Sequence, residues 1–253
     1  MRGLKRLFYS LAQATQPRDA AVVLAYHSIS NAQHWSAVSP EQFEAHIRAL
    51  KDGGFNVVSL DRLLEYRKAG TIPPKTVCIT FDDGYRDNYT TAFPILKEYG
   101  FPATIFVITS AIGGTWTVRS ETFDMLSEPE LKELASSGLV SIEPHTVSHP
   151  KLHSIGTEEA QREIRDSKLR LESITGASCR HFAYPFGRMN EGVREAARRA
   201  GIEYAYTIDP GFVRPRDNDL MLRRNAIDRM TDVAEFLGIA RAGRLSRKRL
   251  FSS

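Results

Sequence analysis

The sequence predicts an α/β fold, a distorted (β/α) barrel of seven or eight mainly parallel strands in a single domain. Short apolar runs alternate with segments of helical periodicity, which is typical of parallel α/β proteins. Several of the runs are almost continuously apolar, as expected of parallel strands that are covered on both faces. Seven or eight strands in a chain of 253 residues favour a closed barrel over an open sheet.

The strand candidates follow one another through the body of the chain. They are residues 21–26, 55–59, 76–81, 103–108, 139–143, 181–185, 204–208 and 222–227. Capping signals mark the helices between them. The predicted helices begin at Ser39-Pro40-Glu41-Gln42 and stop at Gly53-Gly54, begin at Ser127 and stop at Gly138, run from about Thr157 to Thr175, and begin again near Thr231. Residues 109–122 have no regular pattern, and we expect a long functional loop there.

The positive charge of the chain lies at its ends. Residues 1–18 carry four basic residues and no acidic one, and residues 241–253 carry five, so the net charge of +4 leaves the rest of the chain at −5. The sequence therefore predicts a basic amphipathic segment at 1–18, a catalytic barrel at 19–240 and a basic tail at 241–253. We expect no nucleic-acid surface on the barrel. Both ends could contact an anionic membrane, so we expect a cytoplasmic protein, or one bound peripherally at the inner membrane, rather than a secreted one.

Two short strings carry the chemistry. Thr80-Phe81-Asp82-Asp83-Gly84 places two carboxylates after a strand candidate, and His145-Thr146-Val147-Ser148-His149 places two imidazoles after another. One aspartate and two histidines make a three-ligand site for a divalent metal with a position left for water. The other aspartate is then available as a base toward that water. His27 also follows a strand candidate, and catalytic groups of barrels gather at such ends.

Each signal has a structural alternative. Asp-Asp-Gly is also a turn sequence, and two histidines four residues apart can be unrelated surface residues. His27 could be a buried structural histidine, while His153 lies close enough in sequence to His149 to compete for a metal. A non-haem iron oxygenase shares the ligand count, but the sequence lacks its usual His-x-Asp/Glu pair. The two cysteines, Cys78 and Cys179, are expected to be reduced rather than bridged.

Together these residues resemble the polysaccharide deacetylase family, carbohydrate esterase family four, over roughly residues 20–228. The strings around Asp82 and His145 match its first two motifs without gaps. Tyr26-His27-Ser28-Ile29 and Phe182-Ala183-Tyr184-Pro185-Phe186-Gly187 look most like the branch that deacetylates the poly-N-acetylglucosamine of biofilms. The resemblance implies a distorted (β/α) barrel and metal-dependent removal of an N-acetyl group from an amino sugar.

The resemblance also implies roles for single residues. Asp83, His145 and His149 would hold the metal, which we expect to be Zn, with Co, Ni or Fe as alternatives. Asp82 would be the general base, and the backbone N–H of Phe186 would help to bind the oxyanion.

The chain departs from the wider family in two places. The wider family has a late histidine as general acid, but this region reads Leu222-Arg223-Arg224, so His27 is expected to replace it. The wider family also has an arginine that orients the base, where this chain has Ala183. We expect Arg224 to supply that charge, with Arg180 as the weaker candidate.

The expected substrate is an N-acetylated amino sugar or polysaccharide, with Trp116, Tyr184 and Phe186 as stacking surfaces. Two alternatives stay open. The protein could deacylate a lipid-linked sugar at the membrane surface, or it could be a catalytically silent glycan-binding barrel.

Overall fold

A parallel sheet forms the main wall of the molecule. The computed structural model describes residues 17–243. The sheet has the strand order β10-β1-β3-β4-β7, with β2 beside the start of β3, and all of its pairs are parallel. Its strands are β1 (Ala21–Tyr26), β2 (Asn56–Val57), β3 (Thr76–Phe81), β4 (Ala103–Val107), β7 (Val140–Pro144) and β10 (Asn225–Ala226).

Two further strands complete a distorted (β/α) barrel, as the sequence predicts. β8 (His181–Ala183) and β9 (Tyr204–Tyr206) pair in parallel, and Tyr206 forms a parallel bridge to Leu222 just before β10. No strand pairing links β7 to β8 within residues 17–243. Side chains close this seam instead, because Glu143 at the end of β7 accepts hydrogen bonds from the backbone N–H groups of Arg180 and His181, each at 3.0 Å.

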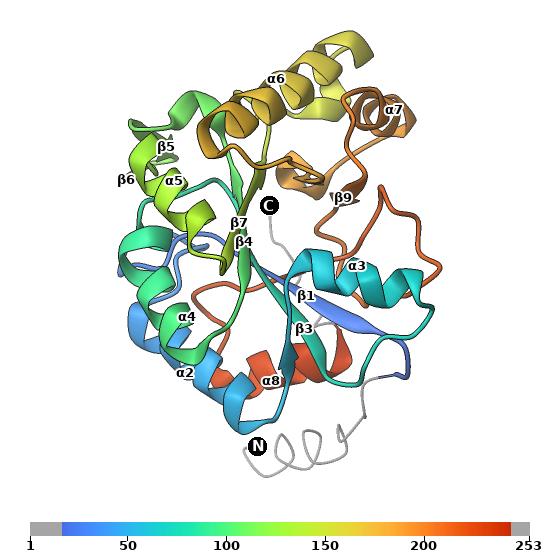
Figure 1. Ribbon diagram of the computed structural model, residues 1–253. Helices are drawn as coiled ribbons and strands as arrows, with labels where there is room; N and C mark the ends of the chain where they lie inside the picture. Colours follow the sequence, from blue (N-terminus) through green and yellow to red (C-terminus); the bar gives the residue numbers. More distant parts are fainter. Residues whose placement is uncertain (1–16, 244–253) are drawn as a thin grey trace.

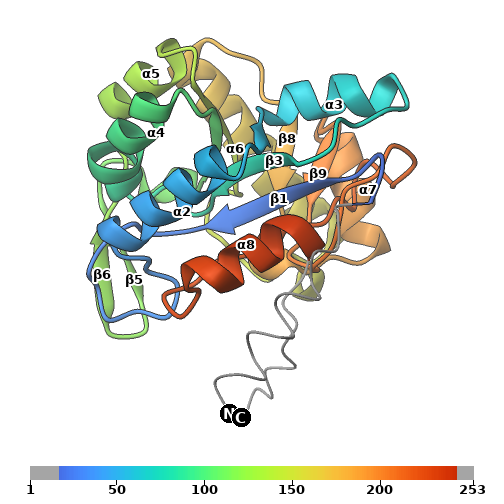
Figure 2. The same ribbon diagram turned by 90° about the horizontal axis from the view of Figure 1, so that it is seen from below.

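Helices cover the outside of the barrel (Figure 1). Helices α2 (Pro40–Asp52) and α8 (Val233–Ala242) pack against each other beside β1, where the first and last described elements meet (Figure 2). Helices α6 (Thr157–Thr175) and α7 (Glu191–Arg199) pack together, and side chains of both share a core cluster with residues of β8 and β9. The described helices are α2 (Pro40–Asp52), α3 (Leu60–Lys68), α4 (Phe93–Tyr99), α5 (Glu128–Ser136), α6 (Thr157–Thr175), α7 (Glu191–Arg199) and α8 (Val233–Ala242), with a π-helical turn at Asn88–Ala92.

Local sequence accounts for these elements. All six residues of β1 and all six of β3 are buried, as the apolar runs predict for strands inside a barrel. The Ser39 side chain caps α2 by accepting a hydrogen bond from the N–H of Gln42, and the apolar stripe that includes Phe43 and Leu50 faces the core.

The structure corrects the prediction for residues 109–122. A hairpin of β5 (Thr115–Val118) and β6 (Glu121–Asp124) lies where we expected an irregular loop. Its strands have four residues each, too few for their alternation to stand out, and the turn depends on Arg119 in a left-handed conformation with φ of 57°. The late strands also prove shorter than predicted, with three residues in β8 and in β9 and two in β10.

The charged ends lie almost entirely outside the described residues, so their predicted membrane contact stays a prediction. Within residues 17–243, no helix is both long enough and apolar enough to span a bilayer. Cys78 and Cys179 are both buried and free.

Candidate active site

The chemical groups predicted from sequence gather at the carboxyl ends of neighbouring strands. Asp82 and Asp83 follow β3, His27 follows β1, and His145 follows β7. These strands lie in one parallel sheet, so their carboxyl ends meet at one end of the barrel.

Asp83, His145 and His149 form a cluster that could hold a metal ion. The Nε2 atoms of His145 and His149 lie 3.5 and 3.6 Å from Oδ1 of Asp83. Three ligands that bind one zinc ion tetrahedrally at about 2.0–2.2 Å are separated from each other by about 3.3–3.6 Å. Two of the three separations between the ligand atoms therefore match those of a tetrahedral zinc site, and all three atoms lie within 4.8 Å of one another. His153 is not part of any such cluster in the described chain.

Backbone strain is concentrated at this cluster. Asp83 has φ of 73° and His149 has φ of 55°, both in the left-handed region that non-glycine residues seldom adopt. Such conformations persist only where the surrounding structure enforces them, and they occur often at functional sites. Neither value is evident from the sequence.

The protonation of the two histidines suits metal binding. Nδ1 of His145 lies 2.8 Å from the carbonyl oxygen of Ala183, and because a carbonyl only accepts, Nδ1 carries the proton and Nε2 has a free lone pair. Burial lowers the pKa of His145 below its usual value. Burial and the nearby His145 lower the pKa of His149 to about 4. Both imidazoles are therefore neutral at pH 7, the form that coordinates metals.

Asp82 forms a buried, bidentate ion pair with Arg224. Nη1 of Arg224 donates to Oδ1 at 2.6 Å, and Nη2 donates to Oδ2 at 2.8 Å. Arg224 is itself fully buried, with its Nε donating to the carbonyl of Thr207. Burial alone would raise the pKa of Asp82, but Arg224, with smaller contributions from His145 and His27, holds it well below its usual range. Arg180, the weaker candidate, pairs instead with Glu203 and Asp61.

His27 lies close enough to influence this site electrostatically, since its charge lowers the pKa of both Asp82 and His149. The backbone around it is fixed from the start of the π-helical turn. Asn88 donates from Nδ2 to the carbonyl of His27 at 2.8 Å, and Asp87 accepts from the Ser28 hydroxyl and from the N–H of Ile29. The Nδ1 atom of His27 is buried without a hydrogen-bond partner in the described structure.

Three aromatic side chains border the site, but Tyr184 is not among them. The ring of Phe186, which is 51% exposed, lies 4.7 Å from that of His149, and Trp116 of the hairpin lies 6.2 Å from His149. Tyr184 is fully buried, and its hydroxyl donates to the carbonyl of Leu220, so the expectation of a stacking surface there is wrong.

The third aromatic residue is Trp35, which is not among the site residues predicted from sequence. It is 49% exposed, and its ring lies 5.7 Å from that of His27. A tryptophan eight residues after a candidate catalytic histidine is the sequence signal that could have identified it.

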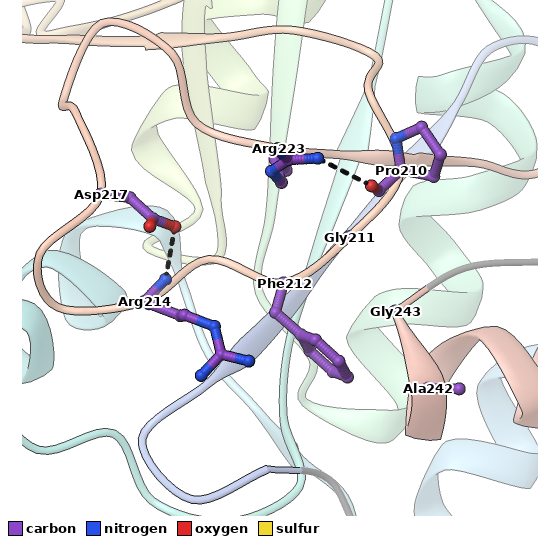
Figure 3. A pocket seen from close by; sticks show the side chains of 8 residues that line it. All are labelled: Pro210, Gly211, Phe212, Arg214, Asp217, Arg223, Ala242 and Gly243. Carbon is purple, nitrogen blue, oxygen red and sulfur yellow. Dashed lines mark hydrogen bonds between the residues drawn. The ribbon is translucent and has the colours of Figure 1, made fainter.

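A separate cavity lies at the other end of the barrel (Figure 3). Phe212, Arg214 and Arg223 line it, and Arg223 donates to the carbonyl of Pro210. The neighbouring Val213 pairs with Ala21, the first residue of β1, which places this cavity away from the strand ends that carry Asp82 and His145.

Comparison with known proteins agrees with this geometry. The family model for polysaccharide deacetylase matches residues 69–205, more than half of the chain. The Bacillus subtilis protein YxkH is 37% identical over 190 residues, covering 75% of this chain, while this chain spans 64% of YxkH. A Staphylococcus aureus poly-beta-1,6-N-acetyl-D-glucosamine N-deacetylase is 30% identical over 229 residues, covering 81% of this chain and 78% of that protein.

Solved structures agree as well. The Streptococcus pyogenes deacetylase PplD, solved in complex with acetate, matches with a TM-score of 0.75 and 27% identity over 86% of this chain and 96% of that one. IcaB from Ammonifex degensii matches with a TM-score of 0.74 and 27% identity over 88% and 96% of the two chains. The chain belongs to the polysaccharide deacetylase family.

Proposed function

We propose that this protein is a metal-dependent N-deacetylase of an N-acetylated amino-sugar polymer. The observation that carries the proposal is a carboxylate, Asp82, which Arg224 keeps ionised next to a three-donor cluster of Asp83, His145 and His149. A base that stays charged beside a metal site is what amide hydrolysis at neutral pH requires. The poly-N-acetylglucosamine deacetylase named among the relatives supports the substrate class.

Asp83, His145 and His149 would hold the ion, for which Zn is the first candidate. When bound, such an ion lowers the pKa of a coordinated water to about 7 and polarises the acetyl carbonyl. Asp82 accepts the proton of the attacking water, while Arg224 fixes the direction of its carboxylate. The backbone N–H of Phe186 donates to the oxyanion that develops on the acetyl group, and one such donor is typically worth about 3–4 kcal/mol.

His27 completes the reaction as the general acid. The carbon–nitrogen bond of the amide breaks only if the amine nitrogen receives a proton, because an amide anion is a poor leaving group. His27 follows β1, close enough to the site to lower the pKa of Asp82, and would deliver that proton. The products are acetate and a free amino sugar. Trp116, Phe186 and Trp35 would contact sugar rings at the border of the site.

The test is acetate release from N-acetylglucosamine oligomers by metal-stripped protein, with and without added Zn, Co or Ni. We expect release that the metal restores and that Asp82→Asn lowers by about 10²–10⁴-fold. Asp52→Asn, at an exposed position at the end of α2, is the matched control and should leave release unchanged.

Two outcomes would contradict the proposal. Tight Zn binding with no release from any soluble oligomer would favour a lipid-linked sugar as substrate, and vesicles that carry such a sugar would then be assayed for acyl release. Glycan binding without acetate release, equally strong in Asp82→Asn, would identify a silent binding barrel.

A further inference from the structure

The loop of residues 145–149, which begins and ends with the two histidines of the cluster, has an unusual backbone. Thr146 has φ of 73° and His149 has φ of 55°, so two of its five residues are left-handed without being glycine. These conformations cost free energy and need contacts that hold them. On one side the loop is fixed by backbone bonds, since the N–H of Ser110 donates to the carbonyl of Val147 at 3.0 Å.

On the other side a single carboxylate holds the loop. Oε2 of Glu163, on α6, accepts from the N–H groups of Val147 and Ser148, each at 2.9 Å. Its Oε1 accepts from the Ser148 hydroxyl at 2.7 Å. Glu163 thus binds three donors of the loop, and hydrogen bonds to an ionised acceptor are the strong ones.

We propose that Glu163 is a positioning residue for the metal, which holds the 145–149 loop so that His149 reaches the ion. The inference rests on the proposed metal site. The His145 ring is fixed directly, by its Nδ1 bond to Ala183, whereas the place of His149 depends on the loop backbone that precedes it. Outer partners of this kind orient metal ligands, and their loss commonly weakens metal binding.

The experiment measures Zn²⁺ affinity of the metal-stripped full-length protein by titration calorimetry. Glu163→Gln removes the negative charge and one of the two acceptor oxygens, so we expect Zn²⁺ to bind about 10–100-fold more weakly. Amide hydrogen exchange at Val147 and Ser148 should become faster. Glu159→Gln, an exposed position one turn earlier on α6, is the matched control and should bind Zn²⁺ like the unchanged protein.

A second variant keeps the test informative. Glu163→Ala removes all three hydrogen bonds and should weaken Zn²⁺ binding further; if it does not fold, Glu163→Gln carries the result. Unchanged Zn²⁺ affinity in Glu163→Gln, with a lowered unfolding temperature, would overturn the inference and leave Glu163 a merely structural residue. Absence of Zn²⁺ binding by the unchanged protein would overturn the proposed metal site itself.

Discussion

Asp82 and Asp83 are neighbours in sequence, but the backbone gives them different environments. Asp82 continues β3, with its N–H donating to the carbonyl of Tyr26, and its side chain meets Arg224. At Asp83 the chain turns with φ of 73°, and its side chain points to the two histidines. One residue of register therefore separates a candidate base from a candidate metal ligand.

The bidentate pair of Asp82 and Arg224 predicts that a positive charge at position 224 is not by itself sufficient for full activity. Arg224→Lys keeps the positive charge but loses the planar pair of donors that meets both carboxylate oxygens. We expect kcat/KM for acetate release, measured at saturating metal, to fall about 10–100-fold because the carboxylate loses its fixed direction. Arg180→Lys, in an ion pair away from the site, is the control. Equal losses in the two variants would argue against an orienting role for Arg224.

Trp35 predicts a binding effect that is separable from chemistry. Trp35→Ala removes an aromatic face beside His27, and we expect KM for N-acetylglucosamine oligomers to rise about tenfold, or ~1.4 kcal/mol, with kcat little changed. Trp35→Phe should lie between. Met230→Ala removes a nearby exposed apolar side chain without a ring. If it raised KM as much as Trp35→Ala, the effect would be general apolar contact rather than stacking.

The seam between β7 and β8 connects the closure of the barrel to a candidate metal ligand. Glu143 binds the start of β8, and His145, two residues later, binds its end through Ala183. Burial raises the pKa of Glu143 well above its usual range. The seam thus depends on a carboxyl group that is favoured in its neutral form.

The neutral form of Glu143 predicts different results for two substitutions at this position. Glu143→Ala leaves the N–H groups of Arg180 and His181 without an acceptor and should lower the free energy of unfolding by about 2–4 kcal/mol in urea titrations. Glu143→Gln resembles the neutral acid and keeps an oxygen that can accept from both, so it should unfold close to the unchanged protein. A large loss in Glu143→Gln as well would mean that the negative charge is needed.

How far the sequence predicts this structure depends on whether a signal is local. Apolar runs define β1 and β3, the Ser39 cap defines α2, and strand ends place Asp82 and His145 together, because each signal lies within a few residues. The β7–β8 seam is absent from the prediction, since its bonds join residues 37 and 38 positions apart. The prediction that Tyr184 is a stacking surface is wrong, because the sequence at a strand end does not show which side chains the neighbouring helices bury.

His46 joins the first elements of the barrel to the last. It lies on α2, its Nδ1 accepts from the Tyr26 hydroxyl of β1, and its Nε2 donates to the carbonyl of Thr231 before α8. Its ring stacks on Phe236 of α8 with centroids 4.2 Å apart. The imidazole at this join is neutral at pH 7, because burial lowers the pKa of His46 to about 4.

This join predicts a loss of stability in mild acid. In an unfolded chain histidine has a pKa of about 6.5, whereas in the folded protein the pKa of His46 is about 4. Between these two values the unfolded state binds a proton that the folded state does not bind. The free energy of unfolding should therefore fall with decreasing pH across this window, with His46 contributing about 1.4 kcal/mol per pH unit. Urea titrations between pH 7.5 and 5, with a chelator present, measure the slope. His46→Gln should reduce the slope by that amount, while His145 and His149 contribute equally to both proteins. An unchanged slope would mean that His46 titrates alike in the folded and unfolded states, and that the barrel closes without a neutral imidazole at this join.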